Sequence, residues 1–313
     1  MRLHERARAV IDAYLDAVGH EVPGLVEGLY LSGSIALGDF RPNTSDIDFV
    51  AVTSERPDPS AIAALHRAHM RLRKQCPRPF FDGRYVTWRD LATDPSQIEC
   101  GPCSYEGRFR SRGCGDCDPV TWHTLACHGV RCLGPELSTI DIWRDTAALM
   151  AWTVNNCDTY WRLLLQRARR VDPWFITAFT SYGTAWVVLG VCRLHYTLST
   201  GRITSKENAG AYGLETFSQR WHRVVEEALR VRRSDQAAPS VTSAISQMAT
   251  DLGIRRASDG GSLYATPRSR RDDVLAFADM VITDARIHFG NDVDRGQSAT
   301  VRSAVHQDIR LAE

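Results

Sequence analysis

The sequence predicts two domains: an α/β domain with a mixed sheet and helices, followed by an all-α helical bundle. Helix-like and strand-like segments alternate up to about residue 135, whereas almost every segment after Ile140 has apolar residues at helical spacing. Leu133, Gly134 and Pro135 separate the two patterns, as expected of a boundary. We expect domains at 1–138 and 139–290, and a polar tail at 291–313. A chain of 313 residues is long enough to bury two cores.

The first domain is expected to run helix, strand, strand, helix, strand. Residues 3–19 have apolar side chains at helical spacing, and 25–31 is a short apolar run that ends before Gly33 and Ser34. Residues 46–52 form a second strand, 59–75 a helix and 80–88 a third strand. Residues 118–135 are expected to close the domain with a helix and a short strand, after a connecting loop that carries cysteines.

The second domain is expected to contain helical segments near 142–170, 173–199, 206–233 and 272–289, joined by turns with Gly or Pro. No run approaches the roughly 18 to 20 apolar residues of a membrane span, and the amphipathic N-terminus is unlike a secretory signal. We therefore expect a cytoplasmic protein without a membrane partner. The net charge of +1 provides no general attraction for nucleic acid. We expect a monomer.

Four of the nine cysteines form two CxxC pairs. The first pair is Cys100 and Cys103, and the second is Cys114 and Cys117. Such pairs are typical of a structural zinc site, and incidental small residues in a Gly-rich connection are the alternative. Cysteines of a cytoplasmic chain are expected to be reduced.

The stretch 29–52 carries the strongest indication of chemistry. Asp46 and Asp48 are two residues apart on a predicted strand, so both carboxylates point to one face. Two carboxylates this close repel each other unless a cation lies between them, and hard oxygen ligands favour Mg²⁺. Gly33 allows a close backbone approach, and the Ser34 hydroxyl can donate to phosphate oxygens.

A third carboxylate is needed to complete the metal site or to act as a base. Asp82, on the next predicted strand, is the candidate for either role. Together these residues predict an in-line phosphoryl or nucleotidyl displacement. Asp-x-Asp alone is weak, because two aspartates on a strand can simply face solvent. The Gly-Ser pair that follows a strand, with eleven residues between Ser34 and Asp46, makes the pattern specific.

This segment resembles the signature of the polymerase-β-like nucleotidyltransferases. From about residue 25 to 232 the chain resembles aminoglycoside nucleotidyltransferases of the streptomycin/spectinomycin 3″-/9-adenylyltransferase type. TWHTLACHGVRCLGP is similar to the segment that closes the family's first domain, and WVVLGVCRLHYTLSTGRITSKENAGAYGL to its central helix and following turn. The resemblance implies transfer of AMP from ATP, with Mg²⁺, to a hydroxyl of an aminoglycoside or aminocyclitol. ATP and the antibiotic would bind in a cleft between the domains.

The resemblance also implies roles for single residues. Ser34 would bind the triphosphate, Asp46 and Asp48 would hold Mg²⁺, and Asp82 stands where the family has a glutamate as catalytic base. Arg193 and Lys206 stand where the family has basic residues that contact the nucleotide phosphates.

The sequence itself supports these two basic residues. Arg193 lies on an apolar helix stripe, where a charge needs an anionic partner, either phosphate or a carboxylate within the bundle. Lys206 is one of only two lysines and follows a Gly-containing turn; a solvated surface lysine is the alternative.

The expected acceptor follows from a departure from the family. The family has acidic residues before the VVL run that recognise streptomycin, whereas this chain has Ser181, Tyr182, Gly183 and Thr184. A spectinomycin-like acceptor therefore fits better than streptomycin. Three residues after the third strand are candidates for contact with the substrate, with ordinary loop packing as the alternative: Tyr105, Glu106 and Phe109.

Two other functions stay open from the sequence. The first is adenylylation of another small metabolite or of a protein hydroxyl. The second is a nucleotide-binding sensor without catalysis, which the presence of Ser34, Asp46, Asp48 and Asp82 disfavours. Nucleic-acid polymerisation is disfavoured because no basic tract or stacking platform accompanies the site.

Overall fold

The computed structural model describes residues 3–113, 117–169, 180–234 and 261–290. Within these residues the chain forms two compact units, the first ending at Asp145 and the second beginning at Thr146. The sequence places this boundary at residue 138. The intervening segment belongs to the first unit, because Ile142 is buried in its core and the Trp143 amide donates to the Leu91 carbonyl at 2.8 Å. Each unit is described below by itself.

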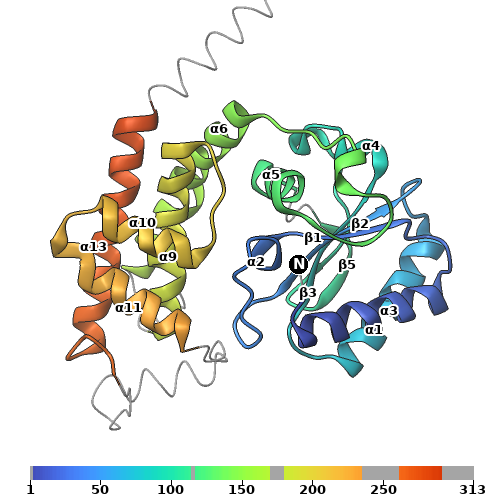
Figure 1. Ribbon diagram of the computed structural model, residues 1–313, viewed down its shortest axis with the longest axis horizontal. Coiled ribbons are helices and arrows are strands. Elements are labelled where there is room, and N and C mark those ends of the chain that lie inside the picture. Colours follow the sequence, from blue (N-terminus) through green and yellow to red (C-terminus); the bar gives the residue numbers. More distant parts are fainter. Residues whose placement is uncertain (1–2, 114–116, 170–179, 235–260, 291–313) are drawn as a thin grey trace, which may run out of the picture. The chain divides into compact units, whose positions relative to one another are not determined.

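A mixed sheet forms the centre of the first unit. In the described residues it has six strands in the order β5-β4-β3-β2-β1-β6 (Figure 1). Only β2 and β3 are parallel; the other neighbouring strands are antiparallel. The strands are β1 (Gly28–Leu31), β2 (Ile47–Thr53), β3 (Phe81–Thr87), β4 (Gly101–Tyr105), β5 (Arg108–Gly113) and β6 (Val130–Leu133).

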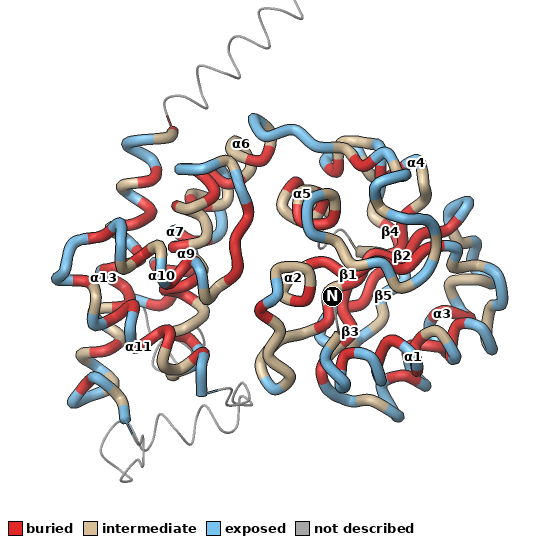
Figure 2. The backbone as a smooth tube through the Cα atoms, in the orientation of Figure 1, coloured by how far each residue is buried: buried red, intermediate tan, exposed pale blue. Residues whose placement is uncertain are grey.

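Helices cover both faces of this sheet, and α1 and α3 lie on the face opposite α2 and α5 (Figure 1). Two apolar clusters result, one under α1 and α3 and one under α5, and Figure 2 shows the buried strands between them. The helices are α1 (Glu5–Glu21), α2 (Gly33–Ala36), α3 (Pro59–Gln75), α4 (Trp88–Leu91), η1 (Pro95–Gln97), α5 (Pro119–His128) and η2 (Leu137–Thr139).

Local sequence explains where the two long central helices begin. Asp58 accepts from the Ala61 amide at the start of α3, and Asp118 accepts from the Thr121 amide at the start of α5. Each aspartate is followed by a proline, whose fixed φ suits the first helical position. The expected helix at 59–75 is confirmed in both bounds.

The expectation of a loop between the third strand and α5 is wrong, because much of this segment forms the hairpin of β4 and β5. Strand β5 is polar and largely exposed, so its sequence lacks the apolar alternation of a strand. β5 pairs with β4, and β4 pairs with β3, so the hairpin forms this edge of the sheet. Glu106 and Gly107 make the turn with φ of 51° and 65°.

The second unit is built from helices in the described residues. The long helix α9 packs against α10, α11 and α13. The expected helix over 206–233 is two helices, because the chain turns at Phe217 between α10 and α11. The elements are α6 (Thr146–Asn156), η3 (Cys157–Trp161), α7 (Arg162–Ala168), α9 (Ser181–Thr200), α10 (Lys206–Thr216), η4 (Gln219–Trp221), α11 (His222–Arg233), α13 (Pro267–Ala285) and η5 (Arg286–Gly290).

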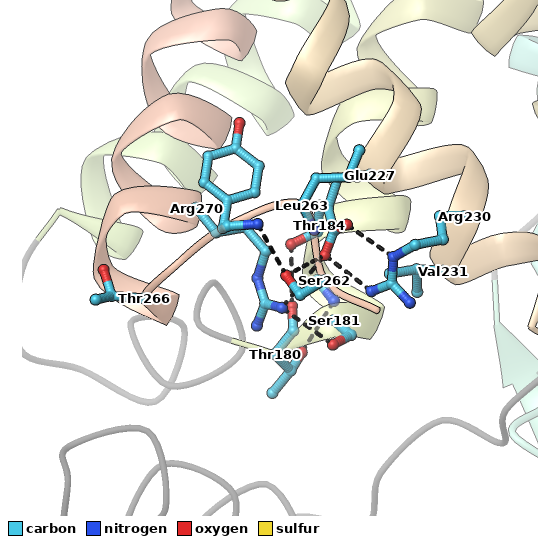
Figure 3. Close-up of polar contacts among 12 residues, drawn as sticks. Thr180, Ser181, Thr184, Glu227, Arg230, Val231, Ser262, Leu263, Thr266 and Arg270 are labelled. Atoms are coloured by element: carbon cyan, nitrogen blue, oxygen red, sulfur yellow. Dashed lines mark hydrogen bonds and ion pairs between the residues drawn. The ribbon is translucent and has the colours of Figure 1, made fainter. Parts of the chain in front are cut away.

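A buried carboxylate joins three parts of this unit (Figure 3). Glu227 on α11 is fully buried and accepts from Arg230 Nε at 2.8 Å and Nη2 at 2.9 Å. Ser262 Oγ and the Leu263 amide also donate to it, and Arg270 Nη1 on α13 lies 3.6 Å away. Burial by itself would raise the pKa of Glu227, but the hydrogen bonds and the Arg230 charge lower it to about 2.

No described helix has the length and apolar character required to cross a membrane.

Replacing this carboxylate is expected to destabilise the second unit. Glu227→Gln leaves Arg270 buried without its anion, a loss of about 3–5 kcal/mol in the free energy of unfolding at pH 7. The folded-state pKa of Glu227 lies below its unfolded value, so its contribution is present above about pH 4.5 and disappears toward pH 2. Urea unfolding at pH 7 and pH 3 measures both effects.

The exposed pair of Glu207 and Arg233 provides the control, with a shortest distance of 2.6 Å. Glu207→Gln is expected to change stability by less than about 1 kcal/mol. Equal, small effects of the two substitutions would contradict a stabilising role for the buried carboxylate.

Candidate active site

The predicted carboxylates lie where the two parallel strands begin. Asp46 comes immediately before β2, Asp48 is the second residue of β2, and Asp82 is the second residue of β3. Asp48 and Asp82 are register partners, so they are neighbours in the sheet. Ile47 and Phe49 belong to the core under α1 and α3, and the alternation of the strand therefore turns Asp48 to the other face.

Gly33 is packed directly against Asp48. A Cβ built on Gly33 would lie 1.8 Å from Asp48 Oδ2, and Gly33 has a φ of +55°. The neighbouring backbones are joined as well, since the Ser32 amide donates to the Asp48 carbonyl at 2.9 Å. Only glycine combines this conformation with this approach. The geometry explains why Gly-Ser and Asp-x-Asp occur together in the sequence.

Ser34 carries a hydroxyl that the fold leaves unused. Its Oγ is buried and has no hydrogen-bond partner in the described residues. A buried polar atom without a partner costs about 1–3 kcal/mol, so it points to a group that binds there. Beside the Asp48 carboxylate, this donor suits an anion that arrives together with a cation.

Asp82 is held by the turn of the β4–β5 hairpin. Its Oδ1 accepts from the Gly107 amide at 2.8 Å and Ser104 Oγ at 3.2 Å, and its Oδ2 accepts from the Glu106 amide at 2.7 Å. Burial raises the pKa of Asp82 above its usual value, although these hydrogen bonds oppose the shift. The result is an oriented carboxylate with raised proton affinity.

Sequence analysis missed the groups that orient Asp82. Ser104 lies on β4, and the two donating amides lie in a turn that was expected to be loop. Gly107 at the second turn position, between two short runs, was the available signal. Without the pairing of β4 to β3, nothing in the sequence connects this turn with Asp82.

The three candidate substrate residues follow Ser104 but do not form one surface. Tyr105 is exposed at the end of β4, with the Arg110 guanidinium 5.3 Å from its ring centroid, and Glu106 is exposed in the turn. Phe109 instead packs into the core under α3, where its ring centroid lies 5.2 Å from that of His69. Of the three candidates, only Tyr105 and Glu106 are exposed beside the turn that holds Asp82.

Arg193 and Lys206 come together within the second unit. Arg193 is on α9, and its Nε donates to the Thr204 carbonyl at 3.1 Å. Thr204 belongs to the turn before α10, whose first residue is Lys206. Arg193 therefore stabilises the turn between α9 and α10 two residues before Lys206. Both side chains are half-buried.

The zinc interpretation of the cysteines is not supported. Cys100 is disulfide-bonded, which also corrects the expectation that all cysteines are reduced. Cys103 and Cys117 form no disulfide, and Cys114 lies outside the described residues. The Cys117 thiol instead donates a hydrogen bond to the Pro95 carbonyl at 3.3 Å. Among the described residues, no group of three or more His, Cys, Asp or Glu side chains is placed to hold a metal ion, so Asp82 does not complete a three-carboxylate metal site with Asp46 and Asp48.

Comparison with known proteins identifies the class first. A nucleotidyltransferase-domain family model matches residues 11–75, the region that contains Gly33, Ser34, Asp46 and Asp48. The chain is thus a nucleotidyltransferase, with this domain on the mixed sheet. A second model, the C-terminal domain of aminoglycoside adenylyltransferases, matches residues 158–252. The two domains in this order place the chain among the aminoglycoside nucleotidyltransferases of the polymerase-β-like superfamily.

One solved structure shows that the resemblance extends over most of the fold. It is a spectinomycin adenyltransferase from Enterococcus faecialis, crystallised with ATP and spectinomycin. The TM-score is 0.55 at 14% sequence identity, and the match covers 85% of this chain and 98% of the other. No curated protein is similar enough in sequence to be matched.

The contact between Gly33 and Asp48 can be tested by a single methyl group. Gly33→Ala would force Asp48 away from its position, and a displacement of about 1 Å can cost a factor of about 100 in rate. We expect at least this loss in nucleotidyl transfer, with the fold retained by circular dichroism. Pyrophosphate release is the measurement.

Gly38→Ala is the matched control. Gly38 also has a positive φ of +67°, but nothing lies within 4 Å of a Cβ placed there. The Gly38→Ala substitution introduces similar backbone strain without a steric clash, so activity should stay near that of the wild type. An equal loss in both variants would attribute the effect to strain alone.

Proposed function

We propose that this enzyme transfers AMP from ATP to a hydroxyl of an aminocyclitol antibiotic of the spectinomycin kind. The observation that carries the proposal is the arrangement of Asp46, Asp48 and Asp82 at the start of the parallel strands, with Ser34 beside them. Carboxylates for a cation, a donor for phosphate and an oriented base are the groups that nucleotidyl transfer requires.

The nucleotide would bind at the Gly33-Ser34 turn. The unused Ser34 hydroxyl fits a phosphate oxygen, and the oxygen donors of Asp46 and Asp48 fit Mg²⁺. When bound, the cation neutralises negative charge on the phosphates. The Gly33 contact holds the Asp48 carboxylate next to Ser34, so binding requires little rearrangement.

Asp82 would act as the base. Its oxygens accept three hydrogen bonds from the hairpin, two at Oδ1 and one at Oδ2, which leaves Oδ2 able to accept the acceptor's hydroxyl proton. The acceptor oxygen then forms a bond to the α-phosphorus, and the bond from that phosphorus to pyrophosphate breaks. Aspartate is one methylene shorter than the family's glutamate, and the hairpin fixes the direction of its carboxylate.

Arg193 and Lys206 of the second unit are candidates for binding nucleotide phosphates. Their positions match those that the family uses, and the bond from Arg193 to the Thr204 carbonyl fixes the turn that carries Lys206. Arg193 thereby orients Lys206 as well as supplying charge.

The preference for a weakly charged acceptor rests on charge pairing. The first turn of α9, which begins at Ser181, contains no acidic residue. Glu227 lies close by, but it is fully buried and paired with Arg230 and Arg270, and Arg270 Nη1 also donates to Ser181 Oγ at 3.3 Å (Figure 3). A dicationic drug would therefore find no available carboxylate at this helix start. The solved relative's crystallisation with spectinomycin agrees with this choice.

A substrate panel tests the proposal. The protein with ATP and Mg²⁺ is expected to release pyrophosphate with spectinomycin and to form an AMP adduct visible by mass spectrometry, with little product from streptomycin. A streptomycin adduct would contradict the charge argument. Tight ATP binding without an adduct on any aminocyclitol would instead point to another metabolite or a protein hydroxyl.

Removing one metal-binding charge is expected to abolish turnover. Asp46→Asn or Asp48→Asn should lower kcat by at least about 1,000-fold, because the cation loses a charged ligand. Their thermal unfolding should stay close to that of the wild type. Asp16→Asn, at an exposed position on α1, is the control and should be fully active. Near-normal turnover of either site variant would refute the metal assignment.

A further inference from the structure

Arg78 lies at the same end of the sheet as the three carboxylates. It belongs to the segment between α3 and β3, and the next strand is parallel to β2. Its Nη1 is 3.9 Å from Oδ1 of Asp46, and about 60% of its side chain is exposed.

Phe80 fixes the direction of this arginine. The Arg78 guanidinium carbon lies 3.5 Å from the centroid of the Phe80 ring, which is the geometry of a cation–π contact. Phe80 in turn lies against the turn that binds Asp82, since a Cβ on Gly107 would be 2.8 Å from Phe80 Cδ1. The Phe80 carbonyl also accepts from the Ile47 amide at 2.8 Å.

Arg78 thus packs, through Phe80, against the elements that position Asp46 and Asp82. A guanidinium is planar, always charged and suited to phosphate, and stacking on an aromatic ring leaves its edge available for hydrogen bonds. At 3.9 Å and in solvent, its attraction to Asp46 is weak. Such an arginine can turn to an incoming polyanion at little cost.

We propose that Arg78 binds the β- and γ-phosphates of the nucleotide and hence the pyrophosphate leaving group. This inference rests on the proposed function, because it assumes that a nucleoside triphosphate occupies the Ser34 and Asp46 site. Arg78 is a nucleotide-binding residue of the first unit that acts on the part of ATP which AMP lacks.

Isothermal titration with ATP, AMP and inorganic pyrophosphate, each with Mg²⁺ and without acceptor, tests this assignment. Arg78→Ala is expected to weaken ATP and pyrophosphate binding by about tenfold, the effect of one charge-assisted hydrogen bond. AMP binding should change less than twofold. Arg78→Lys should recover part of the loss, and Phe80→Leu should give a smaller loss of the same selectivity.

Arg71→Ala is the matched control. Arg71 is also an exposed arginine with a carboxylate 3.9 Å away, Oε1 of Glu21, but it lies on α3. It should leave the affinity for all three ligands unchanged. An equal loss of ATP affinity in Arg71→Ala would show that the loss in Arg78→Ala comes from the change in net charge, which would overturn the proposal.

A different outcome is expected if Arg78 only neutralises Asp46. Arg78→Ala would then leave the ratio of ATP to AMP affinity unchanged and lower the Mg²⁺ concentration for half-maximal binding, which overturns the proposal. Failure of the wild type to bind ATP at all would reject the proposed function itself, and that result does not depend on any Arg78 variant.

Discussion

The contact between Gly33 and Asp48 is the constraint on which the site depends. Antiparallel pairing of β1 with β2 places Leu31 opposite Phe49, so the chain leaving β1 passes directly over Asp48. The missing side chain of Gly33 then admits the carboxylate, and the Ser34 hydroxyl follows at the next position. The residue proposed to bind phosphate and one proposed to bind the cation are thereby brought together by backbone geometry.

Around this contact, the first unit assembles its site from three separate segments. The parallel register of β2 and β3 makes Asp82 a neighbour of Asp48, and the β4–β5 turn secures Asp82 through two amides. Phe80 packs against Gly107 of this turn and supports Arg78. Carboxylates of like charge remain close because each is held by a different element, and a divalent cation would relieve their repulsion.

The charged core of the second unit bears on the acceptor preference that we propose. Glu227 lies beside two arginines and accepts a hydrogen bond from a backbone amide, so its charge is already compensated within the fold. The start of α9, where relatives are expected to present acids, therefore faces a neutralised cluster. The residues that stabilise the second unit thus also support the proposed acceptor preference, because a carboxylate paired in the core cannot also compensate a cationic ligand.

The sequence by itself determined the class of domain, the α/β-then-helical order and the spacing of Gly33, Ser34, Asp46 and Asp48, because local patterns along one strand and one turn encode them. Helix 59–75 was likewise readable from its Asp58-Pro59 start and its apolar stripe. Only the tertiary structure decided that 101–113 is a hairpin, that Ser104 and Gly107 orient Asp82, that Phe109 is a core residue and that Cys100 is disulfide-bonded. These features depend on pairing between segments far apart in the chain, which local periodicity cannot express.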